Sequence, residues 1–271
     1  MMKRMAFYVT VSAVVLYCLG PLLWQFVTSL KPDRELTALP PLLPSRPTLV
    51  HYVSVFEGTS FLRVIVNSAA VASLTTILSV SIGSLSAFGL AKLRVRHKAA
   101  VLALVLAVSM FPPIATVSPL YLIIRALGMR DTIAALTLTY TSFSLPLSIW
   151  ILTSFIRELP DEIYRAARID GCTPLQAFLK VILPLAAPGI VTTAILVFIF
   201  SWNEFLFALT FTATPASRTI PVAIALFPGV HEVPWGEIAA ASVIVTVPLV
   251  AVVFAFQRRI VEGLTAGSIK G

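Results

Sequence analysis

Six long runs of apolar residues alternate with short polar segments along this chain of 271 residues. A helix needs about 20 apolar residues to cross the roughly 30 Å hydrocarbon core of a bilayer, and each run reaches that length. The pattern therefore predicts an all-α membrane protein with six transmembrane helices, folded as a single transmembrane domain over residues 1–271. The expected spans are residues 6–30, 64–91, 99–124, 132–156, 183–211 and 237–256.

Two of the runs also carry information about packing. The second, 64–91, is rich in small and hydroxylated residues, and such residues let neighbouring helices approach closely in lipid. The third contains Pro112, Pro113 and Pro119, which remove backbone donors and break or kink a helix. The break is either an ordinary proline kink or part of a pathway, since irregular backbone at membrane depth is tolerated where it lines a cavity.

The composition supports a membrane protein. Hydrophobic residues make up 58% and charged residues 12% of the chain, whereas soluble domains average roughly 45–50% and about 25%. The net charge of +8 does not indicate nucleic-acid binding, because the basic residues lie between apolar runs and not along one exposed face. Thirteen of the 20 Lys and Arg residues fall on the side of the two termini, so both termini are expected to be cytoplasmic.

The longest polar segment on the expected cytoplasmic side is 157–182. Pro160, followed by two acidic residues, suits the start of a short helix. Gly171 can adopt the left-handed conformation that ends such a helix. Thr173 and Gln176 have the spacing of a capping box, with a proline at the first helical position between them, and so predict a second helix.

The first of these two helices is expected to present a flat surface. Ile163, Ala166, Ala167, Ile169 and Asp170 are separated by three and four residues, which places them near one face. The two alanines leave that face without bulky side chains, so a partner's backbone could come close. The segment is therefore predicted to dock another protein, with an ordinary amphipathic loop helix as the alternative.

This segment resembles the cytoplasmic EAA loop of ATP-binding-cassette (ABC) importer permeases. The resemblance implies that residues 161–176 form the coupling helix that docks on an ATP-hydrolysing subunit. Arg165 stands in place of the family's glutamate and reverses its charge, and Glu162, one helical turn earlier, is the candidate substitute. The residues implied to make this contact are Glu162, Arg165, Ala166, Ala167, Asp170, Gly171 and Pro184.

Three further segments are similar to the carbohydrate-uptake branch of these permeases, maltose-importer type, second permease subunit. They are FSWNEF at 200–205, the link at 119–132 and the tail at 257–271. In a member of this branch the tail inserts between two ATPase subunits, so the resemblance implies a second ATPase contact. Its residues in this chain would be Gly263, Leu264, Thr265 and Lys270.

The resemblance implies the type I importer permease fold and a subunit that carries a sugar or oligosaccharide across the bacterial cytoplasmic (inner) membrane by alternating access. Its implied partners are an ABC ATPase dimer, a second permease that is a different chain, and an extracytoplasmic solute-binding protein. ATP and Mg would bind in the ATPase, so this chain is expected to bind no cofactor and to be no enzyme. The alternatives are an importer of the same class for another solute, such as a phosphorylated polyol, and a self-sufficient channel or secondary transporter.

The sequence contains no catalytic or nucleotide-binding motif. No glycine pair fits the G-x-x-x-x-G-K pattern that holds ATP phosphates. His51, His97 and His231 lie far apart, and Cys18 and Cys172 do not have metal-binding spacing. An intramembrane hydrolase and a metal site are therefore not predicted.

Glu204 is the one acid expected well inside a span, where a charge costs about 2.5–3.5 kcal/mol. With Trp202 and Asn203 it forms a candidate solute pathway, since sugars are bound by hydrogen-bonding side chains and flat aromatic faces. Alternatively, Glu204 lies near the outer end of the span and only fixes helix packing.

Overall fold

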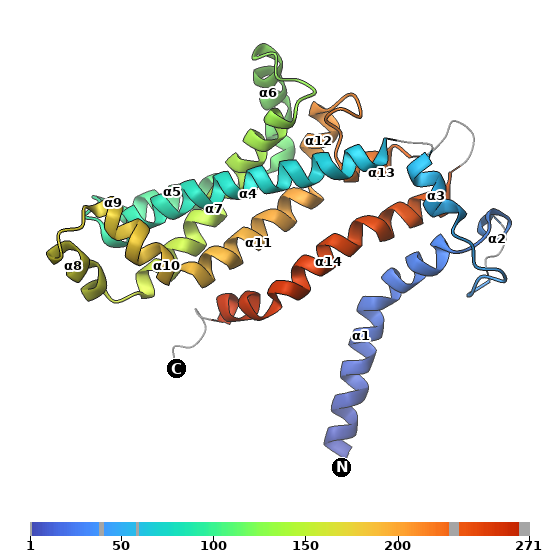
Figure 1. The fold of residues 1–271 in the computed structure, drawn as a ribbon, viewed down its shortest axis with the longest axis horizontal. Coiled ribbons are helices and arrows are strands. Elements are labelled where there is room, and N and C mark those ends of the chain that lie inside the picture. Colours follow the sequence, from blue (N-terminus) through green and yellow to red (C-terminus); the bar gives the residue numbers. More distant parts are fainter. Residues whose placement is uncertain (1, 38–40, 58–59, 228–232, 266–271) are drawn as a thin grey trace. The chain divides into compact units, whose positions relative to one another are not determined.

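The computed structural model describes residues 2–37, 41–57, 60–227 and 233–265, and every regular element in these ranges is a helix (Figure 1). The chain forms two compact units: unit 1 comprises residues 1–63 and 222–250, and unit 2 comprises residues 64–221 and 251–271. The helices are α1 (Met2–Ser29), α2 (Asp33–Thr37), α3 (Val50–Glu57), α4 (Phe61–Lys92), α5 (Lys98–Ser109), α6 (Pro113–Ala126), α7 (Ile133–Glu158), α8 (Asp161–Ile169), α9 (Pro174–Ala177), the π-helix η1 (Phe178–Ile182), α10 (Leu183–Leu185), α11 (Ala187–Asn203), α12 (Leu206–Phe211), α13 (Ile220–Ala225) and α14 (Trp235–Thr265).

Among the described helices, α1, α4, α7 and α14 are each long and apolar enough to cross a membrane. Two further stretches pass the same test as bent spans, namely α5 with α6 and residues 174–185 with α11. The prediction of an all-α membrane protein is confirmed, and the six spans expected from the sequence correspond to these four helices and two bent pairs.

The predicted break in the third span lies at its first two prolines. Pro112 is the N-cap of α6 and Pro113 occupies the first turn, so α5 and α6 meet at 88°. Pro119 lies inside α6 without ending it. A cavity of about 330 Å³ adjoins the break and is lined mainly by apolar side chains, including Phe111 and Phe143. This lining does not suit the hydroxyls of a sugar.

The fifth span differs from the expected continuous helix over 183–211. The chain bends by 79° at Ala186, and α11 ends at Asn203 before the short α12 begins. Pro188, within the first turn of α11, lacks the N–H that would continue the preceding helix. The break between α11 and α12 lies at Glu204, whose carboxylate accepts hydrogen bonds from the first N–H groups of α12.

In unit 2, an apolar core joins the ends of α4 and α7 to η1 and α10. Figure 1 shows α8 and α9 at this end of unit 2, with α6 and α12 toward the other end. Small residues allow α4 and α7 to approach closely, since a Cβ on Gly83 would lie 2.8 Å from Ser148 Cβ. The buried core residues are Ala87, Phe88, Leu152, Ile156, Phe178, Ile182 and Ala186.

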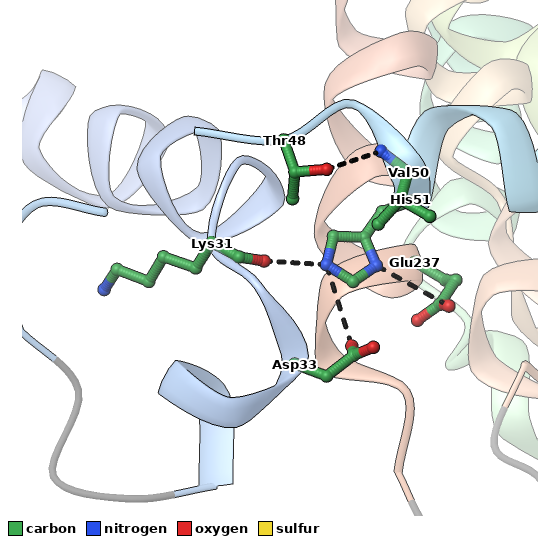
Figure 2. Close-up of polar contacts among 6 residues, drawn as sticks. All are labelled: Lys31, Asp33, Thr48, Val50, His51 and Glu237. Atoms are coloured by element: carbon green, nitrogen blue, oxygen red, sulfur yellow. Dashed lines mark hydrogen bonds and ion pairs between the residues drawn. The ribbon is translucent and has the colours of Figure 1, made fainter. Parts of the chain in front are cut away.

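Unit 1 is organised around His51 of α3, whose side chain is 1% exposed (Figure 2). Its Nε2 lies 2.8 Å from the carbonyl oxygen of Lys31, just after α1. The carboxylates of Asp33 and Glu237 lie 3.8 Å and 3.6 Å from its two ring nitrogens. The ring also lies against Gly236, where a Cβ would approach within 2.2 Å of it. The imidazole thus joins α1, α2, α3 and the start of α14.

Candidate functional site

The polar segment between α7 and α11 folds as the sequence predicts. α8 starts after Pro160 and ends at Ile169, and Gly171 follows with φ of +86°. The N–H of Asp170 donates to the Ala166 carbonyl at 2.9 Å, and that of Cys172 donates to the Ala167 carbonyl at 3.0 Å. A left-handed glycine with such bonds is the usual way to satisfy the last carbonyls of a helix.

The second helix begins with the predicted capping box. Thr173 Oγ1 accepts a hydrogen bond from the Gln176 N–H at 3.3 Å, and Gln176 Oε1 accepts one from the Thr173 N–H at 2.8 Å. Pro174 takes the first helical position. We call the stretch from Asp161 to Gln176 the elbow. Because both of its corners are held by local bonds, the elbow has a defined shape.

The elbow is attached firmly to the end of α4. Lys92 Nζ donates to the Asp161 carboxylate at 2.7 Å and also to the Leu159 carbonyl, and the Lys92 side chain is only 1% exposed. This hydrogen bond and the charge of Lys92 hold the pKa of the Asp161 carboxyl below its usual value. The Phe88 ring lies 5.7 Å from that of Tyr164 in α8 and 5.1 Å from that of Phe178 in η1. α8 is therefore packed against the end of α4.

The surface that α8 presents differs from the predicted face. Ile163 and Ala167 point inward, Ile163 against the apolar core and Ala167 buried at 6% exposure. Ala166 and Asp170 are exposed, and Ile169 is 85% exposed. The prediction that these residues share one face was wrong. The core at Phe88 fixes the rotation of α8, and that contact cannot be inferred from the spacing of residues along the sequence.

The other predicted contact residues lie as follows. Glu162, Arg165 and Gly171 are exposed on the elbow, and Pro184 is exposed in the first turn of α10. Two apolar side chains that were not predicted as contacts, Leu175 and Leu179, are at least half exposed next to the elbow. In the tail, Gly263, Leu264 and Thr265 form the last turn of α14, while Lys270, like His231, lies outside the described residues.

The candidate solute residues are placed differently from one another. Trp202 is buried and stacks on Phe198 at 5.6 Å. Asn203 is exposed, and its amide donates to the Ile199 carbonyl at 2.8 Å. Glu204 is half-buried, and its carboxylate accepts bonds from the N–H groups of Phe207 and Ala208 at 2.9 Å and 3.2 Å. Glu204 therefore caps α12, in agreement with the packing alternative.

At the end of unit 2 away from the elbow, Asp131 joins two loops that are about 80 residues apart. Its carboxylate accepts bonds from the N–H groups of Ala213 and Thr214 at 2.8 Å and 3.1 Å, and from the hydroxyls of Thr214 and Ser217. Burial raises the pKa of the Asp131 carboxyl, but these bonds outweigh burial and lower the pKa below its usual value. The sequence alone does not predict this junction, because the two loops are far apart along the chain.

Asn67, near the start of α4, completes this end of unit 2. Its amide donates to the carbonyls of Pro215 and Arg218 at 3.1 Å and 3.0 Å. In the part of the chain that the structure describes, no group of three or more His, Cys, Asp or Glu side chains is placed to hold a metal ion. Unit 2 therefore carries the elbow at one end and a hydrogen-bonded loop junction at the other.

Residues 79–265 match the family described as "Binding-protein-dependent transport system inner membrane component". The chain is 45% identical over 272 residues to the trehalose transport system permease protein SugB of Mycobacterium tuberculosis, covering 99% of each chain. It is 42% identical to the trehalose/maltose transport system permease protein MalG of Thermococcus litoralis, covering 100% of this chain and 98% of the relative. A crystal structure of a bacterial ABC transporter for alginate import contains a chain of the same fold, with TM-score 0.82, 20% identity and coverage of 95% and 96%.

Proposed function

The chain belongs to the family of binding-protein-dependent transport system inner membrane components, and on this basis we propose that it is the permease subunit of an ATP-driven importer for a sugar or oligosaccharide. The predicted resemblance to carbohydrate-uptake ABC permeases is confirmed by the family match and by relatives named for trehalose and maltose. The chain is a multi-pass membrane protein, and we expect it not to be an enzyme itself, because its relatives are named as permease proteins.

The attachment of the elbow to α4 is the observation that supports this proposal most directly. The buried Lys92 side chain, bonded to Asp161, and the contacts of Phe88 tie α8 to a membrane span. A partner that moves α8 would therefore tilt that span. Only interactions that differ between two conformations drive a transition between them, so the partner must hold the elbow differently before and after ATP hydrolysis.

We infer that this partner is an ATPase dimer, which binds ATP and Mg and receives α8 in a surface cleft. Its contacts on this chain would be Glu162, Arg165, Ala166, Asp170 and Gly171 on the elbow, with Pro184 beside them and the tail residues as a second contact. Ala167 would act from inside, because its side chain is buried.

The remaining partners follow from the same assignment. An extracytoplasmic binding protein would deliver the solute, in keeping with the family description. A second, different permease chain would complete the pathway across the cytoplasmic membrane. We also propose that the elbow side and both termini lie in the cytoplasm, which is supported by the excess of Lys and Arg on that side.

Among the three candidate solute residues, Asn203 is the one we propose to contact the solute. Its side chain is exposed, and its bond to Ile199 uses one of its two N–H groups and leaves the amide oxygen available. Trp202 is held in a buried stack and Glu204 is engaged with α12, so both would support the position of Asn203.

Uptake into vesicles tests the proposal. The chain is reconstituted with a candidate ATPase, second permease and binding protein from the same organism. Labelled trehalose, maltose and a phosphorylated polyol are offered with and without ATP. We expect ATP-dependent uptake of a sugar and none when the ATPase is omitted. Uptake without the ATPase would establish a self-sufficient transporter, and uptake of the polyol alone would overturn the sugar assignment.

Cysteine cross-linking tests the elbow contact separately. The native Cys18 and Cys172, both free thiols, are first replaced by serine. Ala166→Cys places a thiol on the exposed side of α8, whereas Ala167→Cys places one on the buried side. We expect the first to cross-link to the ATPase and the second to serve as the matched control. Equal or absent cross-linking would contradict docking through this face.

A further inference from the structure

A cavity of about 1060 Å³ lies between α8 and the loop that joins α4 to α5 in unit 2. Its lining includes one carboxylate, that of Asp161, so the net charge of the lining is +5. A large positive cavity of this kind favours an anion. Its cationic residues are Lys92, Arg94, Arg96, Lys98, Arg165 and Arg168.

Most of this charge is not neutralised within the chain. Asp161 is paired with Lys92, and Arg168 donates to the carbonyl of Cys172. In the described part of the chain, Arg94 and Arg96 form no ion pair with a carboxylate. Arg165 and Lys98 face the same Asp161 carboxylate that Lys92 already binds. Several guanidinium and ammonium groups are therefore available for an anionic group that enters from outside.

The position of the cavity indicates where that anion comes from. Lys92 is the last residue of α4 and Lys98 the first of α5, so the cavity lies where two membrane-spanning segments end. The headgroup layer of the bilayer lies at this level. Cytoplasmic leaflets carry anionic lipids, and basic pockets at the ends of spans bind their headgroups.

An exposed apolar stripe on α5 continues from the cavity into the hydrocarbon core. Val101, Leu104 and Val108, spaced by three and four residues on one helix face, are exposed, Leu104 at 66%. The stripe begins one turn after Lys98. A dissolved anion or an acidic protein surface would leave this stripe without an occupant, whereas a phospholipid joins its phosphate to acyl chains that would cover the stripe.

We propose that this cavity binds the phosphate headgroup of an anionic phospholipid, with its acyl chains along Val101, Leu104 and Val108. The lipid would lie between Arg94 and Arg96 of the loop and the α8 helix. It would therefore link the elbow to the membrane. The proposal does not depend on which solute the chain carries, nor on the ATPase contact.

Lipid binding to the purified full-length chain in neutral detergent tests this assignment. Fluorescent phosphatidylglycerol is titrated, with phosphatidylcholine and inorganic phosphate as separate probes. R94Q/R96Q removes two charges from the cavity. R157Q/K180Q removes two charges from exposed residues on the same side of unit 2 that do not line it. We expect the affinity for phosphatidylglycerol to fall about tenfold or more in the first variant and less than about twofold in the control.

Each other outcome overturns the proposal. Equal losses in the two variants would mean general surface charge, and no loss in either would mean that the cavity is not the site. Inorganic phosphate binding as tightly as phosphatidylglycerol would identify a dissolved anion. If R94Q/R96Q lowers retention of the ATPase but leaves lipid affinity unchanged, the cavity is a protein interface. Lys98→Gln provides an independent variant at the junction of cavity and stripe.

Discussion

Gly189 of α11 lies directly against the ring of Phe155 of α7, so that a Cβ atom at Gly189 would be 2.5 Å from Phe155 Cγ. This contact sets the distance between two helices of unit 2. We expect Gly189→Ala to force them apart and to lower the free energy of unfolding by about 1–3 kcal/mol. Thermal unfolding of the purified chain in detergent measures this change.

The control for Gly189→Ala is Gly89→Ala, at a helical glycine of α4 with no atom within 4 Å of the added Cβ. It should be neutral or slightly stabilising, because alanine is the better helix former. Phe155→Leu should partly rescue Gly189→Ala. Equal melting temperatures for the two alanine variants would show that α7 and α11 do not pack as described.

The left-handed Gly171 yields a prediction about coupling. Alanine at this position meets no neighbouring atom but must adopt φ near +86°, which costs about 1–2 kcal/mol. We expect Gly171→Ala to reduce solute uptake per ATP hydrolysed while the chain still inserts, and Gly171→Pro to abolish uptake. Uptake and ATP hydrolysis are measured together in vesicles.

Gly128 provides the matched control for this substitution. It also has a positive φ, +66°, and no atom within 4 Å of an added Cβ, but it lies between α6 and α7, away from the elbow. Gly128→Ala should carry a similar backbone cost and leave the ratio of uptake to hydrolysis unchanged. If both variants uncouple equally, strain in general and not the elbow explains the effect.

At the end of unit 2 away from the elbow, the stability of the loop junction held by Asp131 is expected to depend on pH. Hydrogen bonds lower the pKa of its carboxyl in the folded chain below the unfolded value of about 3.9. Its stabilising contribution is therefore complete above that value and is lost as the pH falls through the folded pKa. Asp131 has a φ of +61°, a conformation that asparagine also tolerates. Asp131→Asn should therefore lower the free energy of unfolding by about 1–2 kcal/mol at neutral pH, and by less below pH about 4.

Hydrogen exchange of the amides of residues 212–218 measures this contribution. The wild-type chain should protect them more than the variant at pH about 7, and the two should converge in acid. Glu158→Gln, at an exposed carboxylate of α7, is the control. A difference between wild type and Asp131→Asn that does not change with pH would mean that the charge of the carboxylate is irrelevant to the junction.

The ion pair between Lys92 and Asp161 is expected to hold the elbow against the end of α4. Asp161→Asn removes the carboxylate and leaves the buried Lys92 ammonium without an opposite charge. We expect amide exchange in α8 to accelerate by about fivefold. The double variant Lys92→Met/Asp161→Asn should recover part of the protection, because the unpaired cation is gone. Lys92→Met alone is measured as well, and if the losses of the two single variants simply add in the double variant, the two residues act independently.

The sequence predicts those parts of the molecule that local chemistry determines. Gly171, Thr173 and Gln176 form the turn and the capping box expected of them, and Pro112 breaks the third span. These features depend on residues at most a few positions apart. The six apolar runs are likewise visible because the length of a span is set by the bilayer.

Contacts between distant residues could not be predicted in the same way. The rotation of α8 depends on Phe88, and the loop junction at Asp131 depends on Ala213 and the residues that follow it. The apolar run over 183–211 looks continuous in the sequence, but the helix is interrupted at Glu204. The Glu204 carboxylate accepts hydrogen bonds from the backbone N–H groups three and four residues later. A polar residue in an apolar run is compatible with a cap as well as with a ligand contact, so composition could not decide between them.

The π-helix η1 gives the elbow its orientation. Its wider turn, closed by the bond from the Leu183 N–H to the Phe178 carbonyl, accommodates one more residue than an α-helical turn would. Removing a single residue from 178–182 would restore ordinary winding and rotate everything on the far side by about 100°. Deleting one residue from this short stretch would therefore change the direction in which the elbow points relative to α11.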